Sequence, residues 1–326
     1  MFPDRILSCL TDPAGGELVR ADDGFRNRQS GKVYPDERGV PSLYVPSEGE
    51  AADVATRIRS FYEENPFPSY EGLEEFGELV NKGVKNAFSS RLLEAAGYNK
   101  LVLECGCGTG QLTHFLQLNN NHVLGIDLSL SSLALALEHK RRNQLARSAF
   151  SQMNIFNLAI KDASFDVVIS HGVLHHTHSA REAFAHIVKK VKPGGLVVVG
   201  LYNSYARIPT WLRARVIGVL GPKIDYVVRR RIHDARKADI WIKDQYYNPH
   251  ETWHSIDEVL GWFKENGVEY LNCAPAILDT DAEKGAGYAT PTDPGDRYRR
   301  VLTQIAWLGT IAREGALFDM FGRKAG

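Results

Sequence analysis

The segment of this sequence best suited to binding a ligand runs from Glu104 to Gly110. It reads Glu-Cys-Gly-Cys-Gly-Thr-Gly and follows a short apolar run that begins at Lys100. Glycines between a strand and a helix let the backbone turn sharply and approach a ligand closely. Asp127 ends the next apolar run, where a carboxylate can accept hydrogen bonds from both hydroxyls of a ribose. The two segments together predict a nucleoside site.

The spacing of the glycines distinguishes between nucleoside cofactors. A dinucleotide fingerprint has the pattern G-x-G-x-x-G. Here the glycines are Gly106, Gly108 and Gly110, and Gln111 stands where the third glycine of that fingerprint would be. The tighter spacing behind an acidic residue favours S-adenosylmethionine (SAM), which has no pyrophosphate to cradle. A dehydrogenase is therefore the least favoured function.

Further cofactor contacts are expected where the following strands end. Asn154 follows a strand predicted over residues 149–153, and its amide could bond the adenine amine and a ring nitrogen, although it could equally be a turn asparagine. Ser170 and His171 end the strand predicted over residues 164–170, beside the crevice in which such sheets bind ligands. The residues expected to contact the cofactor are Glu104, Gly106, Gly108, Gly110, Gln111, Asp127, Leu128, Asn154, Ile155, Ser170 and Tyr62.

The elements that must position these residues alternate between strands and helices. Apolar runs at residues 100–104, 122–127, 164–170 and 196–200 are separated by helical patterns such as 131–142 and 180–191. Near-continuous apolar strands between helices indicate a parallel sheet covered on both faces. Residues 192–195 are expected to form a turn before the last of these strands. A helix over 255–267 and strands at 268–273 and 316–321 would complete the sheet.

The motifs resemble those of the class I SAM-dependent methyltransferase family over about residues 84–202. The matching pieces are Glu-x-Gly-x-Gly-x-Gly (104–110), Gly-Ile-Asp (125–127), Phe-Asp-Val-Val (165–168), Gly-Val-Leu-His-His (172–176) and Lys-Pro-Gly-Gly (192–195). The resemblance implies a Rossmann-like α/β fold with a seven-stranded sheet whose last strand is antiparallel. We expect the methyltransferase domain to cover residues 84–326, with a helical insert at 203–254 after the fifth strand.

The first 50 residues are predicted to form a separate β-rich module. Ile-Leu-Ser-Cys (6–9), Gly-Lys-Val-Tyr-Pro (31–35) and Gly-Val-Pro-Ser-Leu (39–43) resemble the zinc ribbon that activates some tRNA methyltransferases. Only Cys9 matches its cysteine pairs, since Asn27 and Ser30 stand where the second pair would be, so we predict a ribbon without metal. Residues 51–83 are expected to be a linker, and the Pro- and aromatic-rich stretch within it either a lid over the cofactor or ordinary packing.

Histidines and polar aromatics near the fourth and fifth strands are candidates for acting on a methyl acceptor. The cluster of His171, His175, His176 and His178 could suggest a metal, but no cysteine or carboxylate set accompanies it. A histidine there could serve as a general base, or only pack against the pocket wall. The acceptor pocket is expected against the insert, near Tyr202, Arg207 and Trp253. The residues predicted to act in catalysis are His171, His176, Tyr246 and His250.

Composition limits the classes of function. The chain holds 39 basic and 39 acidic residues, which disfavours a nucleic-acid substrate, although the basic stretch around 201–250 keeps an RNA or tRNA methyltransferase as an alternative. A non-catalytic SAM-binding protein is the other alternative to the favoured small-molecule methyltransferase. Four cysteines and no long apolar run are typical of a cytoplasmic protein that does not span a membrane.

Overall fold

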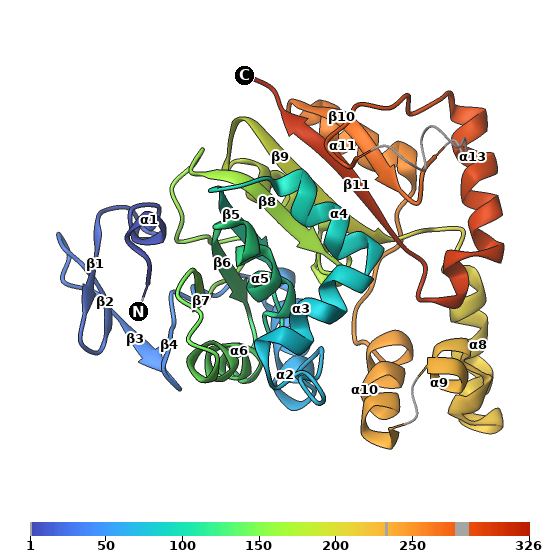
Figure 1. The fold of residues 1–326 in the computed structure, drawn as a ribbon, viewed down its shortest axis with the longest axis horizontal. Helices are drawn as coiled ribbons and strands as arrows, with labels where there is room; N and C mark the ends of the chain where they lie inside the picture. The colour runs from blue at the N-terminus through green and yellow to red at the C-terminus, as the bar shows by residue number, and fades with distance from the viewer. Residues whose placement is uncertain (1, 232–233, 278–286) are drawn as a thin grey trace.

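A seven-stranded sheet forms the centre of the molecule (Figure 1). The computed structural model describes residues 2–231, 234–277 and 287–326. The strands lie in the order β10-β11-β9-β8-β5-β6-β7, and β11 is the one that runs antiparallel to its neighbours. Their bounds are β5 Leu101–Cys105, β6 His122–Asp127, β7 Ser148–Gln152, β8 Phe165–His171, β9 Val191–Tyr202, β10 Val268–Ala274 and β11 Leu317–Lys324. The predicted Rossmann-like α/β fold is confirmed.

Both faces of this sheet are buried, which explains the near-continuous apolar strands. Successive residues point to opposite faces of a strand, so Val102 packs with helix α4 (Ala87–Ala96) while Leu103 packs with helix α7 (Ala180–Val188). The other helices against the sheet are α5 (Gln111–Leu116), α6 (Leu130–Arg142) and α11 (Ile256–Glu265). Helix α11 begins with the expected capping box, in which Ser255 and Glu258 exchange side-chain and backbone hydrogen bonds.

The Lys-Pro-Gly-Gly segment differs from the sequence prediction. We expected a turn before the strand, but residues 192–195 lie inside β9 as a bulge. Phe165 of β8 pairs with Val191 and Val167 pairs with Leu196, so four residues of β9 oppose the single residue Asp166. The strand continues on both sides because its ladder with β8 resumes after the bulge.

The first residues form a second, smaller sheet of four antiparallel strands, as expected for a β-rich module. These are β1 Leu18–Ala21, β2 Gly24–Asn27, β3 Val33–Glu37 and β4 Val40–Pro41, preceded by α1 Asp4–Leu7. The segment after β4 runs beside the outer strand β7, where Leu43 N donates to Gln152 O (3.0 Å) and the Ser42 hydroxyl donates to Gln152 Oε1 (2.7 Å). The small sheet is thereby tied to the edge of the central sheet.

Helices outside the core sheet bring the remaining walls of the site. Two precede the sheet, α2 (Glu50–Glu64) and α3 (Phe76–Lys85), and α3 was not predicted. The insert after β9 holds α8 (Ile208–Leu220), α9 (Tyr226–Arg231) and α10 (Ala235–Tyr246), which Figure 1 shows as a group beside the C-terminal helix α13 (Arg297–Ala306). Among the described residues, no helix is both long and apolar enough to cross a bilayer.

Candidate active site

A cavity of about 710 Å³ lies at the carboxyl ends of β5, β6, β8 and β9. This is the edge at which ligands of parallel α/β sheets bind, and the volume lies within the roughly 300–1,000 Å³ usual for small-molecule sites. The glycine loop, Asp127 and Asn154 line one part of it, and residues of α2 and of the insert line another. The cavity therefore joins the predicted cofactor residues to the predicted acceptor region.

The glycine loop has a conformation that requires glycine. Gly106 and Gly110 have φ values of +79° and +78°, which other residues rarely adopt. A Cβ atom at Gly106 would lie 2.4 Å from the side chain of Val173, and one at Gly108 would lie 2.3 Å from the carbonyl oxygen of Phe67. The loop can thus lie close under a ligand and against its neighbours at once.

Asp127 closes the turn and faces the cavity. Its Oδ2 accepts a hydrogen bond from Gly108 N (2.8 Å) and its Oδ1 accepts one from Ser129 N (2.9 Å). Burial raises the pKa of this carboxyl, although the backbone amides oppose the shift. Since each carboxylate oxygen can accept more than one hydrogen bond, Asp127 retains lone pairs for two ribose hydroxyls.

Glu104 places a second buried carboxyl in the cavity. Its Oε2 accepts a hydrogen bond from the Thr113 hydroxyl, and burial raises its pKa to about 7. Two buried acids beside a glycine loop suit a ligand that brings ribose hydroxyls and positive charge. SAM carries both, in its nucleoside and in its sulfonium and ammonium groups, so the residues present fit this cofactor.

The predicted adenine contact Asn154 is partly committed to the chain itself. Its Nδ2 donates to Val45 O (3.2 Å) and to Ser47 Oγ (2.8 Å), and its Oδ1 accepts from Phe156 N (3.1 Å). The amide oxygen keeps one lone pair that can accept from an adenine amine, but no N–H remains for a ring nitrogen. Ile155 and Leu128 line the cavity beside it, as predicted.

The Pro-rich segment of the linker is bound along the glycine loop. Thr109 N donates to Phe67 O (3.2 Å), and the Tyr70 hydroxyl donates to Thr109 O (2.7 Å). The side-chain amide of Gln111 is occupied as well, because its Nε2 donates to Ser69 O (2.8 Å) and its Oε1 accepts from Lys82 Nζ (2.9 Å). The segment holds the loop in place, and Gln111 lines the cavity with its polar atoms already paired.

Two predicted cofactor contacts have other partners. The Ser170 hydroxyl is buried and donates to Cys105 O (3.0 Å), so this residue ties β8 to β5 and is not among those that line the cavity. Tyr62 does line the cavity, but its hydroxyl donates to Asp244 Oδ1 (2.8 Å) in the insert. Tyr62 thus belongs to the wall formed by the insert.

His171 is held in an ion pair at the end of β8. Its Nδ1 lies 2.6 Å from Asp319 Oδ1 of β11, and its ring stacks on Phe88 at 4.2 Å. Burial alone would lower the pKa of His171, but the charge and hydrogen bond of Asp319 raise it above the usual value. Because its proton is shared with a carboxylate, His171 is poorly suited to accept one from a substrate.

His176 has a free lone pair at the cavity. Its Nδ1 lies 2.8 Å from the carbonyl oxygen of His250, and a carbonyl only accepts, so Nδ1 carries the proton. No described residue pairs with Nε2, on a ring that is 4% exposed and lines the cavity. Burial lowers the pKa of His176, so the ring is neutral at pH 7 and Nε2 can accept a proton.

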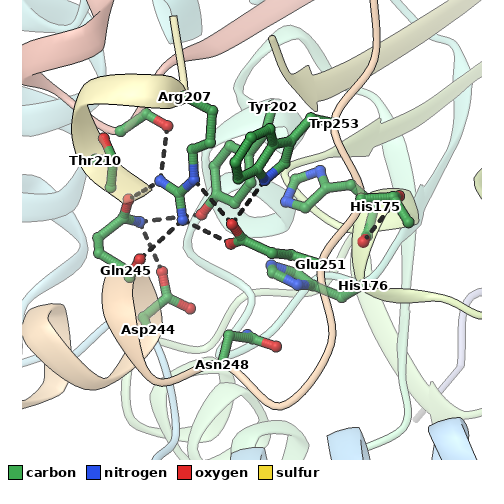
Figure 2. Close-up of polar contacts among 12 residues, drawn as sticks. His175, His176, Tyr202, Arg207, Thr210, Asp244, Gln245, Asn248, Glu251 and Trp253 are labelled. Carbon is green, nitrogen blue, oxygen red and sulfur yellow. Dashed lines mark hydrogen bonds and ion pairs between the residues drawn. The ribbon is translucent and has the colours of Figure 1, made fainter. Parts of the chain in front are cut away.

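The insert adds a network of polar side chains (Figure 2). Gln245 Nε2 donates to Asp244 Oδ2 (2.9 Å) and to the Tyr202 hydroxyl (3.1 Å). Asn248 Nδ2 also donates to the Tyr62 hydroxyl (3.1 Å). Behind them the buried guanidinium of Arg207 pairs with Glu251 at 2.7 Å. These contacts hold together the side of the cavity that the insert forms.

The structure places Tyr246 and His250 outside this wall. The Tyr246 hydroxyl donates to Asp225 Oδ2 (2.5 Å), and neither Tyr246 nor His250 is among the residues that line the cavity. Residues two apart on an α-helix point about 200° apart, so when Asp244 of α10 faces the cavity, Tyr246 faces α9. His250 contributes only its backbone carbonyl to His176. Sequence reasoning selected Tyr246 and His250 in this segment and did not select Asp244, which lines the cavity.

The histidine cluster does not assemble a metal site in the described ranges. His175 is fully buried, packs on Tyr202 with ring centroids 3.9 Å apart, and has a pKa well below its usual value because of burial. Within residues 2–231, 234–277 and 287–326, no three His, Cys, Asp or Glu side chains converge to hold a metal ion. The prediction of a metal-free ribbon remains a prediction.

Comparisons with known proteins agree with this geometry. Residues 103–199 match a family model described as a methyltransferase domain. The chain is 30% identical over 165 residues to the ubiquinone biosynthesis O-methyltransferase of Acinetobacter baylyi, which covers 46% of the chain and 68% of that protein. It is 27% identical over 197 residues to an uncharacterized protein of Synechococcus sp., covering 52% of the chain and 47% of that protein.

A third relative shares a shorter region. Phosphoethanolamine N-methyltransferase 2 of Caenorhabditis elegans is 37% identical over 83 residues, which is 26% of the chain and 19% of that protein. The chain thus spans only part of the length of several curated relatives that it matches. The glycine loop, the acid after β6, the sheet order and the matched domain together show that the chain belongs to the class I SAM-dependent methyltransferase family.

Proposed function

We propose that this protein transfers the methyl group of SAM to a small-molecule acceptor that binds in the same cavity as the cofactor. The observation that carries the proposal is the continuity of that cavity, which joins Asp127 and the glycine loop to His176 and the insert wall. The names of two relatives refer to ubiquinone biosynthesis and to phosphoethanolamine, and they support small-molecule chemistry.

Residues at one end of the cavity would bind the cofactor, and a residue at the other end would accept a proton from the acceptor. Asp127 would accept the ribose hydroxyls and Glu104 would balance the positive charge of the cofactor. SAM supplies an electrophilic methyl group, so the protein has mainly to align the nucleophile and exclude water. His176 Nε2 would accept the proton that an acceptor O–H or N–H loses as it is methylated, because it lies at the cavity and has a lone pair.

A nucleic-acid substrate suits this cavity less well. Four acidic residues line it, Glu104, Asp127, Asp244 and Glu314, and their carboxylates would repel a polyphosphate backbone. The basic side chains that line it, Arg59 and Lys82, are engaged with the Tyr44 ring and with Gln111. RNA therefore remains an outcome of the test and not a second proposal.

The test has a binding step and a transfer step. Isothermal titration of the purified chain with SAM should show one site. Incubation with methyl-labelled SAM and a protein-free small-molecule extract should then yield a labelled product that is lost with His176→Ala. His122→Gln is the matched control, since His122 starts β6 at the opposite edge of the sheet. Label in added tRNA and none in small molecules would contradict the proposal.

A further inference from the structure

We propose that the group methylated by this protein is an amine, which binds as its ammonium ion against Asp244 between aromatic rings. This inference rests on the proposed function and names the substrate class of the same site. Two independent observations point to it: the buried Asp244 carboxylate forms no ion pair with a described cation, and His176 Nε2 at the cavity has no hydrogen-bond partner among the described residues.

Asp244 is buried, with 8% of its surface exposed, and it lines the cavity. Its two hydrogen bonds come from neutral donors, the Tyr62 hydroxyl at 2.8 Å and Gln245 Nε2 at 2.9 Å. Burial raises the pKa of Tyr62, so this hydroxyl stays protonated and donates. Each carboxylate oxygen keeps a lone pair, and no described cation forms an ion pair with them.

The cation nearest to Asp244 in this network is already matched. Arg207 forms two hydrogen bonds to the Glu251 carboxylate, at 3.2 and 2.7 Å, and its other N–H groups bond Gln245 and Gly315. Arg207 is therefore hydrogen-bonded to Glu251 and not to Asp244, although the Asp244 carboxylate also contributes to raising the pKa of Arg207. A buried unpaired carboxylate is costly unless a cation or further donors reach it.

Aromatic side chains surround this charge. Tyr62, Tyr202, His176 and Trp241 line the cavity around the insert wall. Ring faces attract a cation, and they do so more strongly where water is excluded. An ammonium group has donors and no acceptors, so it can donate to the Asp244 oxygens on this wall and to His176 Nε2. A carboxylate or phosphate placed there would be repelled.

These residues account for the proton and the electron pairs that move during the methyl transfer. The bound ammonium ion gives one proton to His176 Nε2, and its nitrogen lone pair then forms the bond to the methyl carbon. The bond between that carbon and the cofactor sulfur breaks, and its electron pair stays on sulfur, which leaves S-adenosylhomocysteine (SAH). The product nitrogen is again positively charged, and the proton on His176 passes to solvent when the product leaves.

The test compares a cation with a neutral molecule of the same size. Butylamine and butan-1-ol are titrated into the protein saturated with SAH, and SAH binding itself is measured first for every variant. We expect butylamine to bind at least about tenfold more tightly than butan-1-ol, and Asp244→Asn to abolish that preference. Asp239→Asn is the control, because Asp239 lies on the same helix with its side chain 60% exposed and paired with Lys243.

Several results would overturn the inference. They are equal or tighter binding of the alcohol, no binding of the amine, or an undiminished preference for the amine in Asp244→Asn. Should that variant fail to fold, the ratio in the unmodified chain decides alone. If the unmodified protein does not bind SAH, the proposed function is contradicted instead. Failure of the amine inference can therefore be distinguished from failure of the proposed function.

Discussion

Asp127→Ala should remove most of the affinity for SAM and SAH. The carboxylate already bonds Gly108 N at 2.8 Å and Ser129 N at 2.9 Å, and its remaining lone pairs face the cavity. Hydrogen bonds to a charged acceptor contribute about 1.5–3 kcal/mol each. Loss of two such bonds, about 3–6 kcal/mol together, should therefore weaken binding by about two to four powers of ten, since about 1.4 kcal/mol corresponds to a factor of ten.

The same substitution should also lower stability, because it leaves two buried backbone amides without acceptors, at about 1–3 kcal/mol each. Isothermal titration with SAH gives the affinity, and thermal unfolding without ligand gives the stability. Asp127→Asn keeps one acceptor oxygen, so its SAH affinity and its stability should lie between those of the unmodified protein and those of Asp127→Ala. Asp162→Ala is the control, since its side chain is 67% exposed. Unchanged SAH affinity in a destabilised Asp127→Ala protein would refute the ribose assignment.

Three further predictions concern protonation and metal content. Burial raises the pKa of Glu104 from 4.5 to about 7 in the folded protein. The folded protein therefore holds this proton more tightly than the unfolded chain, and the free energy of unfolding should fall as pH rises from about 5 to about 8. Denaturation measured across this pH range should show that Glu104→Gln removes the fall. Asp319 raises the pKa of His171, so the ion pair between them stabilises the fold fully below the unfolded pKa of 6.5, and this stabilisation is lost as pH rises through the folded pKa. Asp319→Asn should therefore lower the free energy of unfolding more at pH 6 than at pH 9. An equal decrease at the two pH values would show that the pair is not charged. With Asn27 and Ser30 in place of cysteines, elemental analysis should find no stoichiometric zinc, and one zinc per chain would disprove the metal-free ribbon.

Much of the core could be predicted from the sequence because local pattern and burial agree there. The strand His122–Asp127 has the predicted bounds, and the helix predicted over 131–142 forms as Leu130–Arg142. Apolar runs predict strands wherever both faces of the sheet are buried. The bulge in β9 was missed because Lys-Pro-Gly-Gly is typical of a turn, and only its pairing with β8 shows that the strand continues.

The cofactor end of the site was easier to predict than the acceptor end. Glycines and an acid at strand ends indicate their role through local geometry alone. The acceptor wall depends on which side of α10 faces the sheet, and Asp244 and Tyr246 of one helix point to different neighbours. The role proposed for His176 depends on the His250 carbonyl, which comes from a distant loop and has no signal in the sequence around the histidine.

A crystal structure of the protein with bound SAH would test most directly whether one cavity holds the cofactor and presents it to the insert wall. We predict the ribose hydroxyls within hydrogen-bond distance of Asp127, the homocysteine portion beside the glycine loop, and the sulfur facing the space between His176 and Asp244. SAH bound elsewhere, or with its sulfur turned away from His176, would contradict both the cofactor site and the proposed transfer.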